Sequence, residues 1–267
     1  MTTPTDPGND GLRTTFVDDI PVLYAPPAAE TDRHRLALWL HFLGGRKEAM
    51  SEYLLRLAAA GFTAVSLDAW RHGERSGESA TDPMARALEA FRREVWPILG
   101  HTTLDALRVV DWALETFDLK PSVVAGGVSM GGDVAVALAG VDPRVARVAA
   151  MVATPDWTRP GMAGLDGSSP PLVQGEPTAY GQWLYDRLDP MTHLDAFRRG
   201  PAITFELGAA DRHIPPANAH AFRDALADVA PRAAERVRIR EHPGLDHLGG
   251  ARDPDVQSAA LAWLLVP

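Results

Sequence analysis

Residues 123–140 read VVAGGVSMGGDVAVALAG, and this stretch changes character halfway along. It begins as a β-branched apolar run of the kind found in strands and ends as an Ala/Val/Leu stretch of helical type. Between the two halves, four glycines surround Ser129. The stretch therefore predicts a strand, a sharp turn that carries a serine, and a helix.

The same alternation of strand and helix patterns runs along most of the chain. Strands are expected at 15–25, 35–43, 62–70, 122–127, 145–153, 202–208 and 236–241. Helices are expected at 51–61, 83–96, 103–117, 130–139, 216–228 and 254–265, with a break near Pro97–Gly100. Such alternation predicts an α/β fold in which a mostly parallel sheet has helices on both faces.

Two segments depart from this rhythm. Residues 1–14 are mostly polar and are expected to form a disordered tail, followed by one α/β domain over 15–267. Residues 155–200, rich in proline, glycine and tryptophan, are expected to insert as a short lid over the carboxyl end of the sheet.

Composition excludes several classes of protein. The net charge of -9 and the absence of an Arg/Lys stripe argue against nucleic-acid binding. No apolar run approaches the roughly 20 residues of a membrane span, and the first ten residues do not resemble a signal peptide. Without cysteine the chain has no disulfide or thiolate metal site, and it shows neither metal-ligand spacing nor a nucleotide-binding glycine loop. We expect a cytoplasmic protein with a small-molecule substrate and no cofactor or metal. The sequence leaves open whether the protein forms a homo-oligomer.

Residues 127–131 read GVSMG and match the pattern G-x-S-x-G. Between a strand and a helix, this pattern is typical of a nucleophile elbow, which holds a serine hydroxyl above the sheet. The helix N-terminus that follows favours negative charge near the serine. The alternative is a glycine-rich turn whose serine only caps the helix.

A serine nucleophile needs a base and an acid, and in this architecture they follow in the order Ser, Asp/Glu, His. Asp211 and His247 both follow predicted strands, at the edge where parallel sheets form ligand crevices. Each alone could be an ordinary loop residue, but their order and placement beside Ser129 favour a triad. Asp156 is the rival acid, and His242 is a weaker base.

These motifs resemble those of the α/β-hydrolase superfamily, in particular the bacterial esterase branch related to dienelactone hydrolases and prolyl-oligopeptidase-type catalytic domains. The segment HFLGGRKE (41–48) is similar to the oxyanion-loop motif of that branch, and LDAWRHGERSG (67–77) is similar to one of its strand-to-loop segments. The resemblance implies a hydrolase with Ser129, Asp211 and His247 as nucleophile, acid and base. It also implies that the backbone N–H groups of Met130 and Leu43 bind the oxyanion.

Phe42 departs from the family pattern, which has glycine after the histidine. A phenylalanine there is expected to reshape the oxyanion loop, since only glycine lets the backbone approach a substrate closely. The expected activity is hydrolysis of an ester or thioester of a small apolar or aromatic acid. Phe42 also suggests an alternative, a lyase, cyclase or acyltransferase on the same scaffold. A ligand-binding protein with a vestigial triad is the third hypothesis.

Substrate contacts are expected from Phe42, Trp157 and Trp183, because an apolar lid favours acyl or aromatic groups. The alternative is that the lid residues only pack onto the core.

Overall fold

The structure, a computed structural model, describes residues 11–77, 83–167 and 171–266. Most of the predicted N-terminal tail, residues 1–10, lies outside the described residues, and the first strand begins at Arg13. No helix in the described part of the chain is long and apolar enough to cross a membrane.

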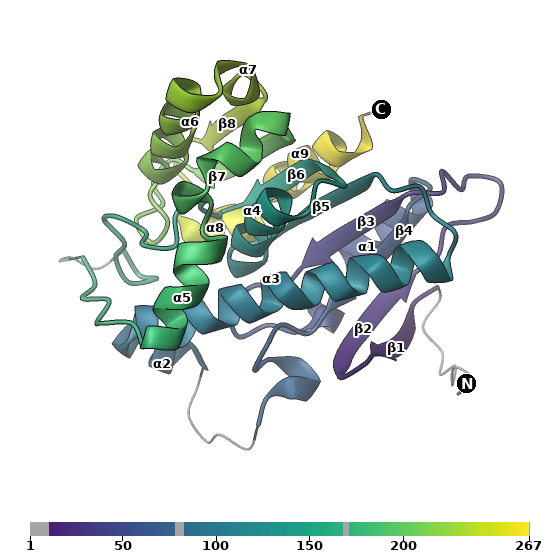
Figure 1. The fold of residues 1–267 in the computed structure, drawn as a ribbon, viewed down its shortest axis with the longest axis horizontal. Coiled ribbons are helices and arrows are strands. Elements are labelled where there is room, and N and C mark those ends of the chain that lie inside the picture. The colour runs from purple at the N-terminus through teal and green to yellow at the C-terminus, as the bar shows by residue number, and fades with distance from the viewer. Residues whose placement is uncertain (1–10, 78–82, 168–170, 267) are drawn as a thin grey trace.

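Within the described residues, eight strands form one twisted sheet, which confirms the predicted α/β fold (Figure 1). Along the sheet the order is β1-β2-β4-β3-β5-β6-β7-β8. The pairs β1–β2 and β2–β4 are antiparallel and the other pairs are parallel, so only β2 runs against the rest. The strands are β1 (Arg13–Val17), β2 (Ile20–Ala25), β3 (Leu36–Leu40), β4 (Thr63–Leu67), β5 (Val123–Val128), β6 (Val145–Met151), β7 (Ala202–Gly208) and β8 (Val237–His242).

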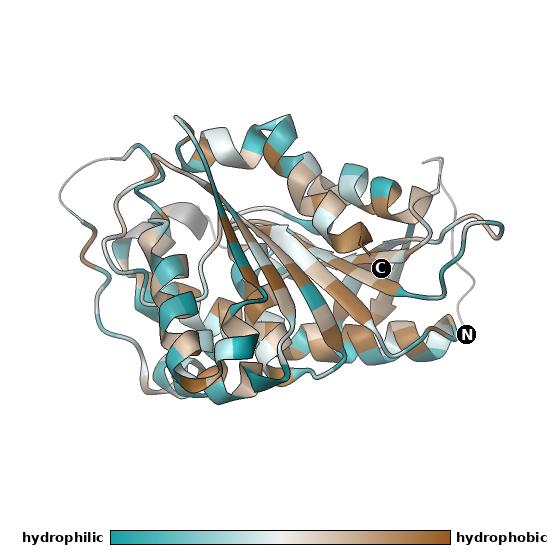
Figure 2. Ribbon diagram, turned by 90° about the horizontal axis from the view of Figure 1, so that it is seen from above, coloured by the Kyte–Doolittle hydropathy of each residue, from teal (hydrophilic) through white to brown (hydrophobic). Residues whose placement is uncertain are grey.

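The sheet lies between two layers of helices (Figure 2). Along β3, Leu36, Leu38 and Leu40 enter one apolar core, whereas Ala37 and Trp39 enter the other, because successive side chains of a strand point to opposite faces. The first core is covered by α3 (Phe91–Thr116), α4 (Met130–Val141) and α6 (Ala217–Val229). The second is covered by α1 (Ser51–Ala59) and α9 (Pro254–Leu265).

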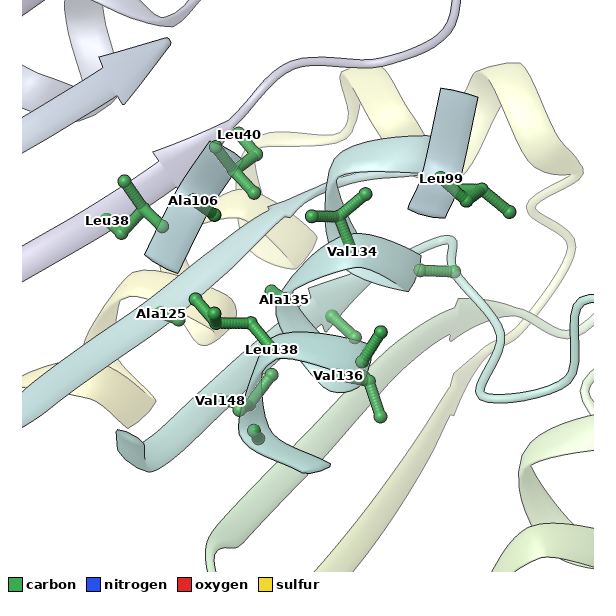
Figure 3. Close-up of a cluster of buried hydrophobic side chains, with 14 of the residues drawn as sticks. Leu38, Leu40, Leu99, Ala106, Ala125, Val134, Ala135, Val136, Leu138 and Val148 are labelled. Carbon is green, nitrogen blue, oxygen red and sulfur yellow. The ribbon is translucent and has the colours of Figure 1, made fainter. Parts of the chain in front are cut away.

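Helix α4, which follows Ser129, is buried over most of its length. Figure 3 shows Val134 and Leu138 of this helix among Leu38, Ala125 and Val148 of the strands beneath it. A helix that is apolar all round requires burial on several sides. This packing fixes the start of α4, and with it the position of the serine.

The predicted strand 15–25 is a hairpin of β1 and β2. The two strands turn at Asp18, which has a positive φ of 54°. Aspartate adopts this left-handed conformation more readily than most residues because its short side chain bonds locally to the backbone. The chain therefore reverses where an uninterrupted strand was expected.

The predicted break near Pro97–Gly100 was wrong, because α3 runs through both residues. A separate helix, α2 (Pro83–Glu89), precedes it. Tertiary packing outweighs the loss of one helical hydrogen bond at Pro97: Trp96 stacks on Tyr185 with ring centroids 4.2 Å apart. At Gly100 an added Cβ would lie 2.8 Å from Leu184, so the glycine lets the neighbouring helix approach closely.

That neighbour is α5 (Ala179–Leu188), which lies in the insertion and packs across α3 (Figure 1). The remaining short helices are η1 (Lys47–Met50), η2 (Gly73–Arg75), η3 (Pro190–Thr192), η4 (Leu194–Arg199), α7 (Pro231–Ala234) and α8 (His247–Arg252). Residues 168–170 of the insertion lie outside the described residues. That the insertion works as a lid stays a prediction.

Candidate active site

Ser129 lies between β5 and α4 in a strained backbone conformation, with φ 53° and ψ -118°. Such a conformation costs about 1–3 kcal/mol and persists only where the surroundings enforce it. Here the Ser129 N–H donates to the Met151 carbonyl at 2.8 Å. The turn is also very tight: a Cβ at Gly131 would lie 2.2 Å from the Leu40 carbonyl oxygen, and one at Gly127 would lie 2.6 Å from it. Glycine is therefore required at both positions.

Ser129, His247 and Asp211 are joined by hydrogen bonds. The Ser129 Oγ lies 3.1 Å from His247 Nε2, and His247 Nδ1 lies 2.8 Å from Asp211 Oδ2. Because a carboxylate only accepts, the Nδ1–H donates to Asp211 and leaves Nε2 free to accept from the serine. All three residues are buried. This arrangement can remove a proton from the serine hydroxyl and stabilise the imidazolium that results.

The loop after β7 holds Asp211 in place. Its other oxygen, Oδ1, accepts from the backbone N–H groups of His213 at 2.9 Å and Ile214 at 2.7 Å. The loop that carries His247 is tied to this one, because the Ala210 N–H donates to the Leu245 carbonyl at 2.9 Å. Two loops from different strand ends thus form one unit beside the serine.

The rival residues have other partners. Asp156 accepts from the hydroxyl of Thr158 at 2.6 Å, and His242 lies 2.8 Å from the buried Glu206. Asp246, which directly precedes His247 in the chain, caps α8 by accepting from the Gly249 N–H at 2.7 Å. In the described residues, these three side chains take no part in the hydrogen-bond chain at Ser129.

Residues 42–45 form a β-turn beside the serine. The Gly45 N–H donates to the Phe42 carbonyl at 2.9 Å, and Gly44 has φ 78°, which is typical of the third position of a type II turn. His41 accepts from the Ala69 N–H at 3.0 Å through Nε2, so its Nδ1 carries the proton that is donated to the Phe42 carbonyl at 2.8 Å. Burial lowers the pKa of His41 to about 4 and keeps the ring neutral.

This turn determines where the Leu43 N–H points. The carbonyl of a peptide and the N–H of the next residue point in opposite directions. Because His41 and Gly45 bind the Phe42 carbonyl on one side, the Leu43 N–H is directed to the other side. Among the described residues neither this N–H nor that of Met130 donates to a protein acceptor. Both are therefore available to a ligand.

A buried ion pair anchors the end of this loop. Lys47, only 1% exposed, donates through Nζ to Asp68 at 3.0 Å, and its backbone N–H donates to the same carboxylate at 2.8 Å. Burial opposes the lysine charge, but hydrogen bonds to Glu48, Glu74 and Asp68 outweigh it and raise the pKa of Lys47. The pair joins the loop after β3 to the loop after β4.

A cavity of about 420 Å³ opens at the serine. Ser129, His247, Met130, Leu43 and Phe42 all line it. The remaining lining is largely apolar and includes Met50, Tyr53, Val95, Leu165 and Leu248. The structure thus brings together six of the predicted site residues: five around the cavity, and Asp211 behind His247.

Neither tryptophan predicted to bind substrate lines the cavity. Trp157 is fully buried in the first core, beneath α3 and α4, where its carbonyl accepts from the Trp96 indole at 2.9 Å. Trp183 is 49% exposed on α5, with Arg187 over its ring. In the insertion, Trp157 thus packs in the core, whereas Trp183 lies on the outer surface.

Two buried polar residues of the cavity, His213 and Arg159, were not predicted from the sequence. His213 lies two residues after Asp211, so its place on the same loop was a usable signal. Arg159 is buried and paired with Asp133 on α4. No local pattern marks this pairing of residues 26 positions apart. In the part of the chain that the structure describes, no three His, Asp or Glu residues are grouped as a metal site would need.

The fold and the buried Ser129–His247–Asp211 arrangement are those of a serine hydrolase of the α/β-hydrolase superfamily, as the sequence motifs predicted. The profile of the prolyl oligopeptidase family matches residues 88–266, and the chain belongs to that family.

Solved structures share the fold over nearly the whole chain. TT1662 from Thermus thermophilus is 26% identical with a TM-score of 0.72, and the match covers 95% of this chain and 96% of that one. A Klebsiella pneumoniae protein assigned as a dienelactone hydrolase is 18% identical with a TM-score of 0.67, covering 95% and 97%. A mycobacteriophage D29 protein assigned as a non-haem haloperoxidase is 36% identical over 115 residues, 43% of this chain and 34% of that protein. The matched segment thus spans about a third of the phage protein.

Proposed function

We propose that the protein is a carboxylesterase that hydrolyses esters or thioesters of small apolar or aromatic acids through an acyl-enzyme on Ser129. The observation that carries this proposal is the continuous hydrogen-bond chain from Asp211 through His247 to a strained, cavity-facing serine. The membership of the chain in a serine-hydrolase family supports it.

In the first half of the reaction, the Ser129 Oγ attacks the carbonyl carbon while its proton moves to His247 Nε2. Asp211 stabilises the imidazolium through Nδ1, and the N–H groups of Leu43 and Met130 donate to the oxyanion. The intermediate then collapses, the carbon–oxygen or carbon–sulfur bond to the leaving group breaks, and His247 returns the proton to that group.

In the second half, water attacks the acyl-enzyme. His247 takes one proton from the water, a second oxyanion forms in the same place, and the acyl carbon–Oγ bond breaks. The proton returns to Ser129 and the free acid leaves. In the resting structure His247 Nε2 already lies within hydrogen-bond distance of the Ser129 Oγ, as general acid–base catalysis requires.

The cavity supports a small substrate. A volume of about 420 Å³ suits a short acyl chain or a single aromatic ring, and the lining from Leu43, Met50 and Leu248 is apolar. Phe42, 40% exposed, lines the same cavity.

Phe42 also bears on the choice between hydrolysis and a lyase, cyclase or transferase. Its carbonyl is bound by His41 and Gly45 and therefore does not point at the oxyanion position. A phenylalanine in place of glycine leaves the Leu43 N–H available, so the feature that suggested non-hydrolytic chemistry does not block hydrolysis. This favours the esterase.

The test is intact mass after incubation with a fluorophosphonate, together with hydrolysis of p-nitrophenyl butyrate. We expect the wild type to gain one probe adduct and to turn over the ester. Ser129→Ala should gain no adduct and lose activity by a factor on the order of 10⁶. His247→Ala should lose most of its labelling and most of its ester hydrolysis, because the Ser129 hydroxyl then has no base.

Ser66→Ala is a matched control, because Ser66 is a buried serine on β4 outside the cavity whose Oγ has no hydrogen-bond partner among the described residues. This variant should be labelled like the wild type. A folded wild type without adduct or turnover would refute the proposal, and equal turnover by Ser129→Ala would refute the role of the serine.

A further inference from the structure

Arg159 is a buried cation beside the candidate nucleophile. It follows β6, is 3% exposed, and lines the same cavity as Ser129 and His247. Its Nη2 donates to Asp133 on α4 at 2.5 Å, and its Cζ lies 4.8 Å from the centre of the Phe91 ring. Taking a guanidinium out of water costs several kcal/mol, so the fold must compensate this charge.

The partners of Arg159 in the structure satisfy only part of its N–H donors. Arginine has five N–H donors, and Nη2 accounts for one of them through Asp133. Nε is buried and has no hydrogen-bond partner among the described residues, and none is found there for Nη1 either. An unsatisfied buried donor costs about 1–3 kcal/mol. The side chain therefore holds more donors at the cavity than the protein itself satisfies.

The backbone at Arg159 is also unusual, with φ 43°. A residue without glycine's freedom pays about 1–3 kcal/mol for such a conformation, and strain of this kind clusters at functional sites. Burial, spare donors and strain thus coincide at one residue on the wall of the cavity.

Neighbouring groups do not supply the missing acceptors. His213 donates through Nδ1 to the Ala163 carbonyl at 2.9 Å, and burial together with Arg159 lowers its pKa to about 3, so the ring is neutral. No hydrogen bond joins this ring to Arg159 among the described residues. Asp133 is already shared with the Thr154 N–H at 2.7 Å. Glu52 and Arg252 line the cavity too, but both are exposed to solvent.

We propose that Arg159 is a specificity-determining residue that selects esters carrying a second oxygen acceptor, a carbonyl or a carboxylate, within a few carbon atoms of the scissile carbonyl. This inference rests on the proposed esterase function. Nε and Nη1 donate to that second oxygen while Ser129 attacks the ester carbonyl. A hydrogen bond to a charged group is worth about 1.5–3 kcal/mol, which corresponds to a preference of roughly 10–150-fold in kcat/KM.

The test compares esters of matched length. Ethyl pentanoate has no second acceptor, diethyl glutarate adds a neutral carbonyl, and monoethyl glutarate adds a carboxylate. The pentanoate ester of glycolic acid places the carboxylate on the alcohol side. We expect kcat/KM of the wild type for at least one acceptor-bearing ester to exceed that for ethyl pentanoate roughly tenfold or more. Which ester is preferred tells carbonyl from carboxylate and acyl side from alcohol side.

The decisive variant is Asp133→Asn/Arg159→Met, which removes both charges together and leaves an acceptor for the Thr154 N–H. It should reduce the preference to within about threefold while retaining activity on ethyl pentanoate and fluorophosphonate labelling. Arg159→Lys keeps an ion pair with Asp133 but lacks the Nε and Nη1 donors of the guanidinium, so it should lose the preference. It also tests the proposal if the double variant does not fold. Arg252→Met, which removes an exposed cation from the same cavity, is the control and should keep the preference.

A wild type without preference, or a folded variant of Arg159 that keeps it, would overturn this proposal while leaving the esterase intact. If the wild type hydrolyses none of the esters and Ser129 takes no fluorophosphonate, both proposals fall. The labelling therefore distinguishes the two failures.

Discussion

Single residues set the geometry at the serine. The tight turn at Ser129, with its positive φ, is possible because Gly127 and Gly131, two residues to either side, have no side chain to collide with the Leu40 backbone. One turn further along the same helix, Asp133 meets Arg159. The elbow thus positions the candidate nucleophile and, through α4, part of the cavity wall.

Gly131→Ala tests this geometry. Its Cβ would lie 2.2 Å from the Leu40 carbonyl oxygen, which is backbone and cannot rotate away. We expect the free energy of unfolding in urea to fall by about 1–3 kcal/mol, as for other overpacking substitutions, and fluorophosphonate labelling to slow. Gly77→Ala is the matched control, since nothing lies within 4 Å of its added Cβ. An unchanged unfolding free energy for Gly131→Ala would contradict the clash.

At the scale of elements, the contact between α3 and α5 holds part of the insertion against the core. Trp96 and Tyr185 stack there, and Leu184 occupies the space that Gly100 leaves open. A glycine inside a helix usually weakens it by about 1 kcal/mol relative to alanine. The close approach of the two helices accounts for its presence in α3.

Gly100→Ala should therefore destabilise the protein, although alanine favours the helix. The added Cβ would lie 2.8 Å from Leu184, and we expect a loss of about 1–3 kcal/mol in the free energy of unfolding. A double-mutant cycle with Leu184→Gly checks the cause, because the clash disappears only when the Leu184 Cβ is removed together with its methyl groups. The effect of Gly100→Ala should then disappear or change sign. If Gly100→Ala stabilises the protein with Leu184 present, the packing argument is wrong.

At the scale of the whole molecule, the sheet brings distant segments together at its carboxyl edge. Ser129, Asp211 and His247 follow β5, β7 and β8, and the loops of these strands meet only in the folded sheet. Folding also buries histidines in their neutral form. Burial, followed by the charge of Arg159, lowers the pKa of His213 from its ordinary 6.5 to about 3.

This burial predicts a specific loss of stability in acid. Between pH 6.5 and 3, unfolded His213 binds a proton that the folded protein does not, so the free energy of unfolding decreases as pH falls through this window. One proton contributes about 1.4 kcal/mol per pH unit, or about 2 kcal/mol between pH 6.5 and 5. The measurement is urea unfolding of the wild type and of His213→Asn at pH 7 and pH 5. Between these two pH values, the free energy of unfolding should fall by about 2 kcal/mol less in His213→Asn than in the wild type.

The same substitution at His34, whose side chain is 60% exposed, is the control, because it removes no buried imidazole. Equal losses for His213→Asn and the wild type would show that His213 is protonated in the folded protein at pH 5.

Local sequence patterns were enough to predict the sheet and the order of its strands and helices. Apolar runs, glycine turns and helix periodicity are local properties, and β7 and α9 have the predicted bounds of 202–208 and 254–265. The G-x-S-x-G pattern and the order Ser, Asp, His indicated which residues meet at Ser129, because parallel strands place their carboxyl ends at one edge.

Contacts between segments that are distant in the sequence could not be predicted in this way. Gly100 and Pro97 suggested a helix break, but the packing of α5 keeps α3 continuous. The tryptophans of the insertion suggested substrate contacts, but Trp157 fills the core. The pairing of Asp133 with Arg159 has no local signal, because its energy comes from burial and charge complementarity between groups that meet only when the sheet has formed.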